Sequence, residues 1–425
     1  MTRPVLTVVG IGADGWPGVP DRLRDLVTSA EVVLGGERHL RLLPDVPDQV
    51  REAWPSPLRA GLPGLLERYG DRRVVALASG DPLVSGIGTT LVDLLGADAV
   101  RLEPAVSSVA LARARLGWSA ESSVLVSAVA RDVRRVLREL APGRRVLVLS
   151  SDATTPGDLA GLLAMSGWGD ARLVVLGDLG APEESRLDGT AAAWADEPPV
   201  VPDLNVVAVE VGEPEPGTPV TWAGGLPDDV FENDGQLTRR DLRAAALARL
   251  APYPGALLWD VGAGAGSVGI EWMRAHPTCR TVAVEADPQR ARRVRRNAGR
   301  LGVPDLRVVE GRAPDALAGL AAADATPDAV FVGGGATRPG VLEACLEALA
   351  PGGRLVVHGV TVETEALLAR RYGALGGELT RISVETAAPI GTFSGFTPAR
   401  AVTQWAWTKP HPSYLAADTT EETSS

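Results

Sequence analysis

The 425-residue sequence has only two cysteines, a single lysine and 4% aromatic residues. Cys279 and Cys345 lie far apart without a C-x-x-C pair, so the sequence predicts neither a disulfide framework nor a thiolate metal site. The four histidines are also scattered without the spacing of metal ligands. We therefore expect a protein without a bound metal, in a reducing compartment such as the cytoplasm.

Long apolar runs and an excess of positive charge are lacking as well. No stretch of about 18 apolar residues occurs, and the apolar run that begins at Val5 stops at Gly10. The sequence thus predicts neither a membrane span nor a signal peptide. The formal net charge is −11, whereas a nucleic-acid-binding protein needs a basic face. We expect no membrane or nucleic-acid partner.

The chain is long enough for two or three domains, and its apolar content of 45% permits complete globular folding. Residues 212–226 include glycines and prolines without helical or strand periodicity, which is typical of a linker. The sequence therefore predicts an N-terminal domain over residues 1–211 and a C-terminal domain over residues 227–410. The polar residues 411–425 are predicted to be a disordered tail.

The clearest motif lies in residues 256–271, where an apolar run predicts a buried strand that leads into Asp260. Gly262-x-Gly264-x-Gly266 follows before the pattern becomes helical, and a later strand over residues 281–284 ends in Glu285. Glycines let the backbone approach a ligand closely, and the first amides of a helix can face a polar or anionic group. This order of strand, glycine turn and helix predicts a nucleotide-type site.

The glycine motif alone leaves the nucleotide open. Gly264-x-Gly266-x-x-Gly269 with Glu285 also satisfies the dinucleotide fingerprint, so a nicotinamide-dependent oxidoreductase is one alternative. A binding module without catalytic activity is another. With Asp260 ahead of the glycines, the segment resembles class I S-adenosylmethionine methyltransferases, in which the turn receives the methionine part and the acid binds the ribose. The resemblance implies cofactor contacts for Asp260, Gly262, Ala263, Gly264, Ala265, Gly266 and Glu285.

Further residues of the C-terminal half extend this resemblance. Ala313 stands in a turn that lies at the adenine in related enzymes, although Arg312 replaces their usual Asp. Thr238 corresponds to a threonine that reaches the cofactor in related enzymes. With Asp241 it also has the form of a capping box before a helix over residues 240–251. The resemblance therefore adds Thr238 and Ala313 to the expected cofactor site.

The later strands of this half predict the substrate side of the site. Gly333, Gly334 and Gly335 follow a strand over residues 329–332 and would leave room for a flat substrate. His358 follows the next strand and, by doubly wound topology, faces the same crevice, where it is a candidate catalytic or orienting group. An antiparallel pair of strands over residues 382–385 and 401–407 is expected to end the domain.

The N-terminal half alternates predicted strands and helices, which indicates an α/β domain. Its first strand closes on Gly10-Ile-Gly12, another strand closes on Ser79-Gly80-Asp81-Pro82, and a third segment contains Ser107-Ser108. These segments resemble the tetrapyrrole (corrin and porphyrin) methylases, in which the cofactor lies folded between two α/β lobes. The resemblance implies cofactor contacts for Gly10, Gly12, Gly80, Asp81, Val84, Ser107 and Ser108.

One segment departs from that family. Members of its C5-methylating branch usually have Ser-x-His-Gly-Arg where this chain has Ser127-Ala-Val-Ala130-Arg131. The missing His and Gly could reshape the face that meets the tetrapyrrole. Arg131 remains a candidate for contacting a carboxylate of the substrate.

Together the resemblances predict an α/β protein, with a two-lobed tetrapyrrole methylase fold followed by a Rossmann-like class I methyltransferase fold. This order resembles the fused methyltransferases of cobalamin biosynthesis. It implies methylation of precorrin-6B at C5 and C15, with decarboxylation of the ring C acetate to give precorrin-8X. We expect one S-adenosylmethionine per domain, a tetrapyrrole substrate and a homo-oligomer. Methyl transfer mainly needs alignment and a dry pocket, so no dedicated nucleophile is required.

Overall fold

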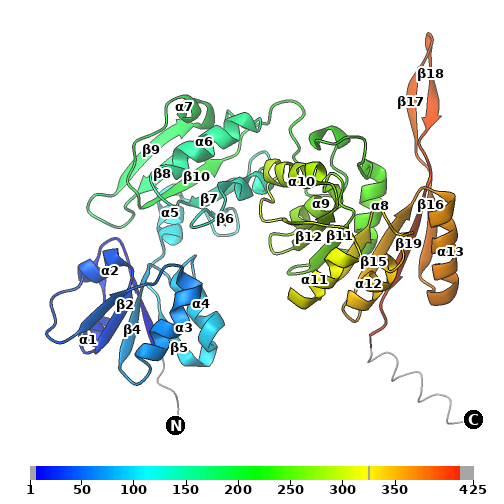
Figure 1. The fold of residues 1–425 in the computed structure, drawn as a ribbon. Coiled ribbons are helices and arrows are strands. Elements are labelled where there is room, and N and C mark those ends of the chain that lie inside the picture. Colours follow the sequence, from blue (N-terminus) through cyan, green and yellow to red (C-terminus); the bar gives the residue numbers. More distant parts are fainter. Residues whose placement is uncertain (1–5, 324–325, 412–425) are drawn as a thin grey trace, which may run out of the picture. The chain divides into compact units, whose positions relative to one another are not determined.

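The structure is a computed structural model that describes residues 6–323 and 326–411 (Figure 1). The chain divides into two compact units, Met1–Pro216 and Gly217–Ser425. Nearly all of the segment predicted as a disordered tail, residues 411–425, lies outside the described residues. Within the described ranges, no helix is both long and apolar enough to cross a membrane.

The first lobe of the N-terminal unit is a parallel five-stranded sheet whose central strands are apolar and largely buried. Such strands are typical of sheets covered on both faces. In spatial order the strands are β3 (Val50–Ala53), β2 (Val32–Gly35), β4 (Val74–Ser79), β1 (Leu6–Ile11) and β5 (Val100–Glu103). The accompanying helices are α1 (Asp21–Thr28), α2 (Glu37–Arg41), α3 (Leu58–Arg68) and α4 (Ile87–Leu95).

The second lobe is a mixed five-stranded sheet, in which only β6 and β7 pair in parallel. Its strands in spatial order are β6 (Val124–Ser127), β7 (Arg145–Leu149), β10 (Asn205–Glu210), β8 (Arg172–Gly177) and β9 (Ser185–Thr190). Its helices are α5 (Ser108–Leu116), α6 (Thr155–Met165) and α7 (Ala191–Asp196). The two sheets confirm the predicted two-lobed architecture.

The C-terminal unit contains a seven-stranded sheet whose first five strands are parallel. In spatial order the strands are β13 (Arg307–Glu310), β12 (Arg280–Glu285), β11 (Leu257–Val261), β14 (Ala329–Val332), β15 (Arg354–Gly359), β19 (Val402–Thr408) and β16 (Glu378–Ile382). The chain order reverses between β11 and β14. Ligands of such sheets bind outside the carboxyl ends of the strands at this point.

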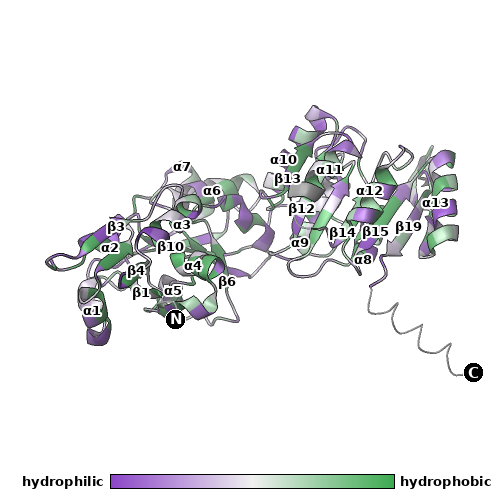
Figure 2. Ribbon diagram, turned by 60° about the horizontal axis from the view of Figure 1, so that its bottom comes forward, coloured by the Kyte–Doolittle hydropathy of each residue, from purple (hydrophilic) through white to green (hydrophobic). Residues whose placement is uncertain are grey.

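Six helices accompany this sheet in the described part of the unit: α8 (Arg240–Leu250), α9 (Ser267–Ala275), α10 (Pro288–Arg300), α11 (Asp315–Ala323), α12 (Val341–Ala348) and α13 (Val362–Leu375). Figure 2 shows apolar residues along β14, β15 and β19 and polar residues on part of α13. The helix α10 illustrates the pattern, because Ala291, Val294 and Ala298 are buried whereas its arginines are mostly exposed. The predicted α/β fold class is therefore confirmed.

The end of the chain differs from the prediction. The strand expected over residues 382–385 is instead β16, which ends at Ile382. Between β16 and β19 the chain forms a separate two-stranded sheet of β17 (Glu385–Ile390) and β18 (Phe393–Pro398). We call these two strands the ribbon. Apolar and polar residues do not alternate in either strand, and Phe393 is 80% exposed, so hydrophobic periodicity could not predict the ribbon.

Candidate active sites

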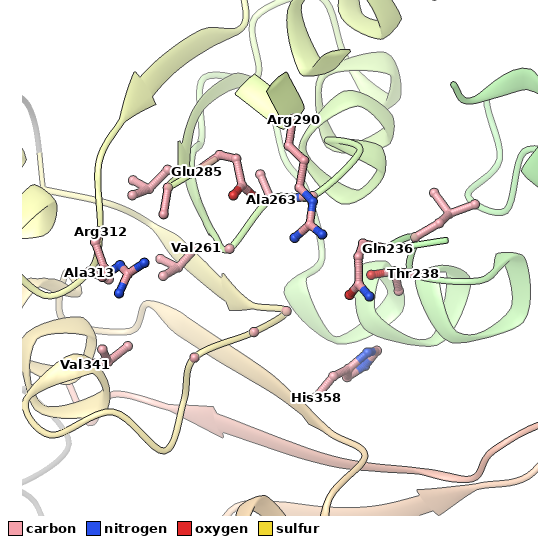
Figure 3. A pocket seen from close by; sticks show the side chains of 18 of the residues that line it. Gln236, Thr238, Val261, Ala263, Glu285, Arg290, Arg312, Ala313, Val341 and His358 are labelled. Carbon is pink, nitrogen blue, oxygen red and sulfur yellow. Dashed lines mark hydrogen bonds between the residues drawn. The ribbon is translucent and has the colours of Figure 1, made fainter. Parts of the chain in front are cut away.

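A cavity of about 430 Å³ opens at the carboxyl ends of β11, β12, β14 and β15 (Figure 3). Its volume lies within the range of roughly 300–1,000 Å³ that is usual for small-molecule sites. Nine of the residues predicted for this half line it: Thr238, Gly262, Ala263, Gly264, Glu285, Ala313, Gly333, Gly334 and Gly335. His358 also lines it. The topology therefore brings together segments that are more than 100 residues apart in the sequence.

The glycine turn is fixed by its backbone and its neighbours. Gly262 and Gly264 have φ values of 71° and 60°, which L side chains rarely adopt. A Cβ atom at Gly262 would lie 3.0 Å from the Gly334 carbonyl oxygen, and one at Gly264 would lie 2.9 Å from the Gln236 carbonyl oxygen. These glycines thus allow three loops to meet at the cavity wall.

The carboxylate of Glu285 is held by the same turn. Its Oε2 accepts a hydrogen bond from the Gly264 amide at 2.8 Å, and its Oε1 accepts one from the Asp287 amide at 3.0 Å. Each carboxylate oxygen can accept more than one hydrogen bond, so both can also face hydroxyl groups in the cavity. The backbone therefore orients this acid before any ligand binds.

Asp260, Ala265 and Gly266 are not among the residues that line the cavity. The buried Asp260 side chain accepts a hydrogen bond from the Gly269 amide at 3.0 Å, which ties β11 to the first turn of α9. Burial raises the pKa of this carboxyl to about 7, and the charge of Glu285 adds to the effect. Asp260 thus supports the turn from behind.

Thr238 does not form the predicted capping box. The helix α8 begins at Arg240 with Arg239 as its N-cap, and no side chain caps it. Thr238 precedes the N-cap and lines the cavity, while its carbonyl oxygen accepts a hydrogen bond from Arg243 at 2.5 Å. The capping prediction was wrong because the chain enters the helix one residue later than the sequence pattern suggests.

His358 is a buried, neutral member of the cavity wall. Its Nε2 lies 2.9 Å from the Gln404 Oε1, and its ring meets Phe331 edge-on with 5.1 Å between centroids. Burial lowers its pKa below the usual value, so the imidazole is uncharged near pH 7. Figure 3 shows His358 on the same side of the cavity as Gln236 and Thr238, across from Arg312.

A second cavity, of about 280 Å³, lies between the two sheets of the N-terminal unit. Six residues predicted for this half line it: Gly12, Gly80, Asp81, Val84, Ser107 and Ser108. The opposite wall comes from the second lobe, with Leu149, Leu176 and Asn205 among its residues. The cleft between lobes that the resemblance implies is therefore present.

Three of these residues also have local structural roles. Gly80 has a φ of 53°, and the Oδ1 of Asp81 accepts a hydrogen bond from the Leu83 amide at 2.9 Å. Ser107 caps α5 by accepting from the Ala110 amide at 3.2 Å. Gly10 is not among the lining residues, and a Cβ atom there would lie only 1.9 Å from the Gly80 carbonyl oxygen. Gly10 thus lets β1 pack against the loop that forms the wall.

Arg131 is exposed and is not among the residues that line this cavity. Its neighbour Ala130 has a φ of 52°, in the left-handed region that favours the glycine of the related motif. A non-glycine residue in this conformation costs roughly 1–2 kcal/mol. Ala130 therefore takes the backbone conformation that favours glycine although it is not one. Val129, two residues before Arg131, lines the cavity, whereas Arg131 does not.

Comparison with known proteins places both units in one family. Residues 5–195 match the family model of the tetrapyrrole (corrin/porphyrin) methylases, and residues 229–409 match that of the precorrin methyltransferase domain. A precorrin-6Y C(5,15)-methyltransferase [decarboxylating] of Sinorhizobium sp is 47% identical over 409 residues, which cover 96% of this chain and 97% of the relative. The chain belongs to the precorrin-6Y C5,15-methyltransferase family.

Other members of the precorrin-6Y C5,15-methyltransferase family match as well. The enzyme of that name from Mycobacterium tuberculosis strain CDC 1551 is 45% identical over 407 residues, which cover 95% of this chain and all of the relative. The crystal structure of the C-terminal domain of precorrin-6Y C5,15-methyltransferase from Rhodobacter capsulatus is 39% identical. It covers 44% of this chain and 100% of that one, with a TM-score of 0.42.

Several residues that line the two cavities of this precorrin-6Y C5,15-methyltransferase family member were not predicted from the sequence. Gln236, Arg290 and Arg338 line the C-terminal cavity, and Asn205 lines the N-terminal one. Asn205 is 6% exposed and accepts a hydrogen bond from the Ser150 hydroxyl at 2.6 Å. A polar residue at the start of the apolar run that forms β10 was the signal that could have revealed it.

Proposed function

We propose that the chain methylates precorrin-6B at C5 and C15 and decarboxylates the ring C acetate, giving precorrin-8X in cobalamin biosynthesis. The observation that carries the proposal is the pair of cavities. Each lies where a strand runs into a glycine turn, one in each of two different folds. The family membership of the whole chain supports the same reaction. In this proposal the N-terminal unit acts at C5 and the C-terminal unit acts at C15.

In the C-terminal cavity the chain's residues would hold S-adenosylmethionine, which supplies an electrophilic methyl group. Glu285 can accept from both ribose hydroxyls because its carboxylate is already oriented by backbone amides. The Cα atoms and carbonyls of Gly262 and Gly264 can approach the methionine part without a side chain in between, while their amides are already donated to Val284 and Glu285. Thr238 and Ala313 complete the proposed cofactor walls. Transfer then depends on alignment and on exclusion of water rather than on a protein nucleophile.

The opposite part of the cavity suits a flat, polycarboxylate substrate. A Cβ atom at Gly334 or Gly335 would meet no neighbour within 4 Å, so the backbone there is open to a large ring. Arg312 and Arg338 also line the cavity and add two cations to its wall. We propose that they attract the acidic side chains of the macrocycle, since guanidinium groups match carboxylates well.

The activity is tested by mass spectrometry of the products formed from precorrin-6B and S-adenosylmethionine, with and without cobalt in the ring. We expect a product that has gained two methyl groups and lost carbon dioxide. Binding of NAD(H) near Gly264 with hydride transfer would instead support the oxidoreductase alternative. Cofactor binding without any turnover would support a binding module.

We predict that each chain binds two S-adenosylmethionine molecules, one in each cavity, because the lining residues come from a single unit in each case. Calorimetric titration of the intact, cofactor-free chain should give a stoichiometry of two. NAD⁺ serves as the control ligand and should give no comparable heat. A stoichiometry of one would contradict the prediction.

We also predict that His358 orients the substrate and does not act as a general acid. Burial keeps its imidazole neutral, and a group that rarely carries its second proton near pH 7 is a poor acid. His358→Asn should therefore retain most of the C15 methylation and carbon dioxide release. A loss of about 100-fold or more that depends on pH, with unchanged cofactor affinity, would show general-acid catalysis instead.

We further propose that the protein is a cytoplasmic homo-oligomer without a nucleic-acid partner. The ribbon supports self-association, because Ile390, Phe393 and Phe396 are 61%, 80% and 72% exposed and a lone pair of strands is marginally stable. The buried free cysteines Cys279 and Cys345 fit a reducing compartment. Light scattering coupled to size-exclusion chromatography measures the oligomeric state directly.

A further inference from the structure

Arg38 lies beside the wall of the N-terminal cavity, on the short helix α2. Its Nη2 donates to the Ser79 hydroxyl at 3.0 Å and lies 2.9 Å from the His39 Nε2. Ser79 lines the cavity and directly precedes Gly80 and Asp81 of the proposed cofactor loop. The guanidinium is therefore hydrogen-bonded to a residue of the cavity wall, although Arg38 is not itself among the lining residues.

The charge of Arg38 is not neutralised by a neighbouring carboxylate. In the described part of the chain, no carboxylate oxygen lies within 4.0 Å of its guanidinium, whereas Arg22 and Arg101 of the same lobe both pair with Glu103. Burial lowers the pKa of Arg38, and the charge of Asp178 opposes this shift. A partly buried guanidinium without a counterion is well suited to bind a carboxylate of a ligand.

The two partners of Arg38 orient it but leave its charge intact. Burial lowers the pKa of His39 to about 4, so its imidazole is neutral and its Nε2 can accept from Arg38. The Ser79 hydroxyl is the second neutral acceptor. The hydrogen bonds found among the described residues use only Nη2, which leaves the N–H groups of Nε and Nη1 for another acceptor.

Asp178 is the acid whose charge acts on Arg38, from the second lobe and beyond ion-pair distance. It directly follows β8 with a φ of 45°, and its amide donates to the Leu204 carbonyl oxygen at 2.9 Å. Leu179 and Leu204 line the cavity. The acid is therefore fixed at the other wall and does not close onto Arg38 in this structure.

We propose that Arg38 is the carboxylate-binding residue of the N-terminal cavity and holds an acidic side chain of the tetrapyrrole during C5 methylation. This inference rests on the proposed function and assigns to Arg38 the role that the sequence suggested for Arg131. A carboxylate at Nε and Nη1 would supply the missing counterion. Ser79 and His39 hold the Arg38 guanidinium and so fix the direction from which the carboxylate binds; they act as positioning residues.

The test is Arg38→Gln in the full-length chain, assayed for C5 methylation with precorrin-6B and labelled S-adenosylmethionine. Loss of one charged hydrogen bond predicts a KM for the tetrapyrrole that is roughly tenfold to a hundredfold higher. The affinity of the N-terminal site for S-adenosylmethionine and the C15 activity of the other unit should not change. Arg59→Gln, which removes an exposed arginine paired with Asp93, is the control.

Further variants separate the possible failures. Arg38→Lys keeps the charge and should recover much of the lost affinity; it also carries the test if the Gln variant does not fold. Asp178→Asn tests whether Arg38 instead acts by attracting Asp178 of the second lobe. If Asp178→Asn raised the KM as much as Arg38→Gln does, that result would overturn the proposal. An active wild type with an unchanged KM in Arg38→Gln would overturn it as well. A wild type that methylates no tetrapyrrole would instead refute the proposed function.

Discussion

Glu285→Ala is expected to raise the dissociation constant for S-adenosylmethionine at the C-terminal site about 100-fold or more. Each charged hydrogen bond to a ribose hydroxyl that is lost costs about 1.5–3 kcal/mol, and about 1.4 kcal/mol corresponds to a factor of ten. The change also removes the acceptor of the Gly264 amide, which holds the glycine turn in place. Calorimetry on the intact chain should show one weakened site and one unchanged site.

Glu310→Ala is the matched control for this experiment. Glu310 stands beside Glu285 in the parallel register of β12 and β13, but it pairs with Arg295 at 2.7 Å and both side chains are exposed. Exposed ion pairs contribute about 0–1 kcal/mol, so the control should leave both cofactor sites intact. An unchanged dissociation constant in Glu285→Ala would show that another group binds the ribose.

Arg243→Met is expected to destabilise the C-terminal unit by about 3–5 kcal/mol, because it leaves the buried Glu271 without its counterion. The Arg243 side chain is 0% exposed, and its Nε donates to Glu271 at 2.5 Å. It also donates to the carbonyl oxygens of Leu226 and Thr238, both at 2.5 Å. Glu271 in turn accepts from the Leu226 amide at 2.9 Å. One guanidinium thus joins α8, α9 and the segment that carries Thr238.

This prediction is measured by thermal unfolding of the full chain. A loss of this size lowers the melting temperature of a unit of about 200 residues by roughly 10 °C. Arg249→Met is the control on the same helix, because Arg249 pairs with the exposed Glu378 at 3.1 Å and should change little. The double variant Arg243→Met/Glu271→Gln should recover part of the loss. Equal melting temperatures for wild type and Arg243→Met would contradict the role of this buried pair.

The elements that build the C-terminal cavity could be predicted because their signals are local. A buried strand followed by glycines, and a second strand that ends in an acid, are patterns within about 30 residues, and parallel topology brings such strand ends together. Glu285 and Gly264 therefore meet as the sequence suggests. The short strands β3, β5 and β9 were not predicted, because they are four to six residues long and partly exposed.

The contacts that could not be predicted depend on partners far apart in the chain. Arg243 and Glu271 each look like ordinary charged residues of amphipathic helices, and only the packing of α8 against α9 buries them together. The segment expected to be a linker shows the same limit, since Leu226 is 1% exposed and bonded to Glu271. Arg38 and Ser79 lie 41 residues apart, so their contact also appears only in the folded lobe.

The ribbon is a separable insertion between two strands of the main sheet. The strands β16 and β19 already pair up to Ile382 and Val402, and the Ala399 amide donates to the Val384 carbonyl oxygen at 2.9 Å where the ribbon departs. The hydrogen bonds of the seven-stranded sheet are therefore complete without any contribution from the ribbon. A short turn between Val384 and Ala399 could therefore replace the ribbon without changing strand register or the cavity.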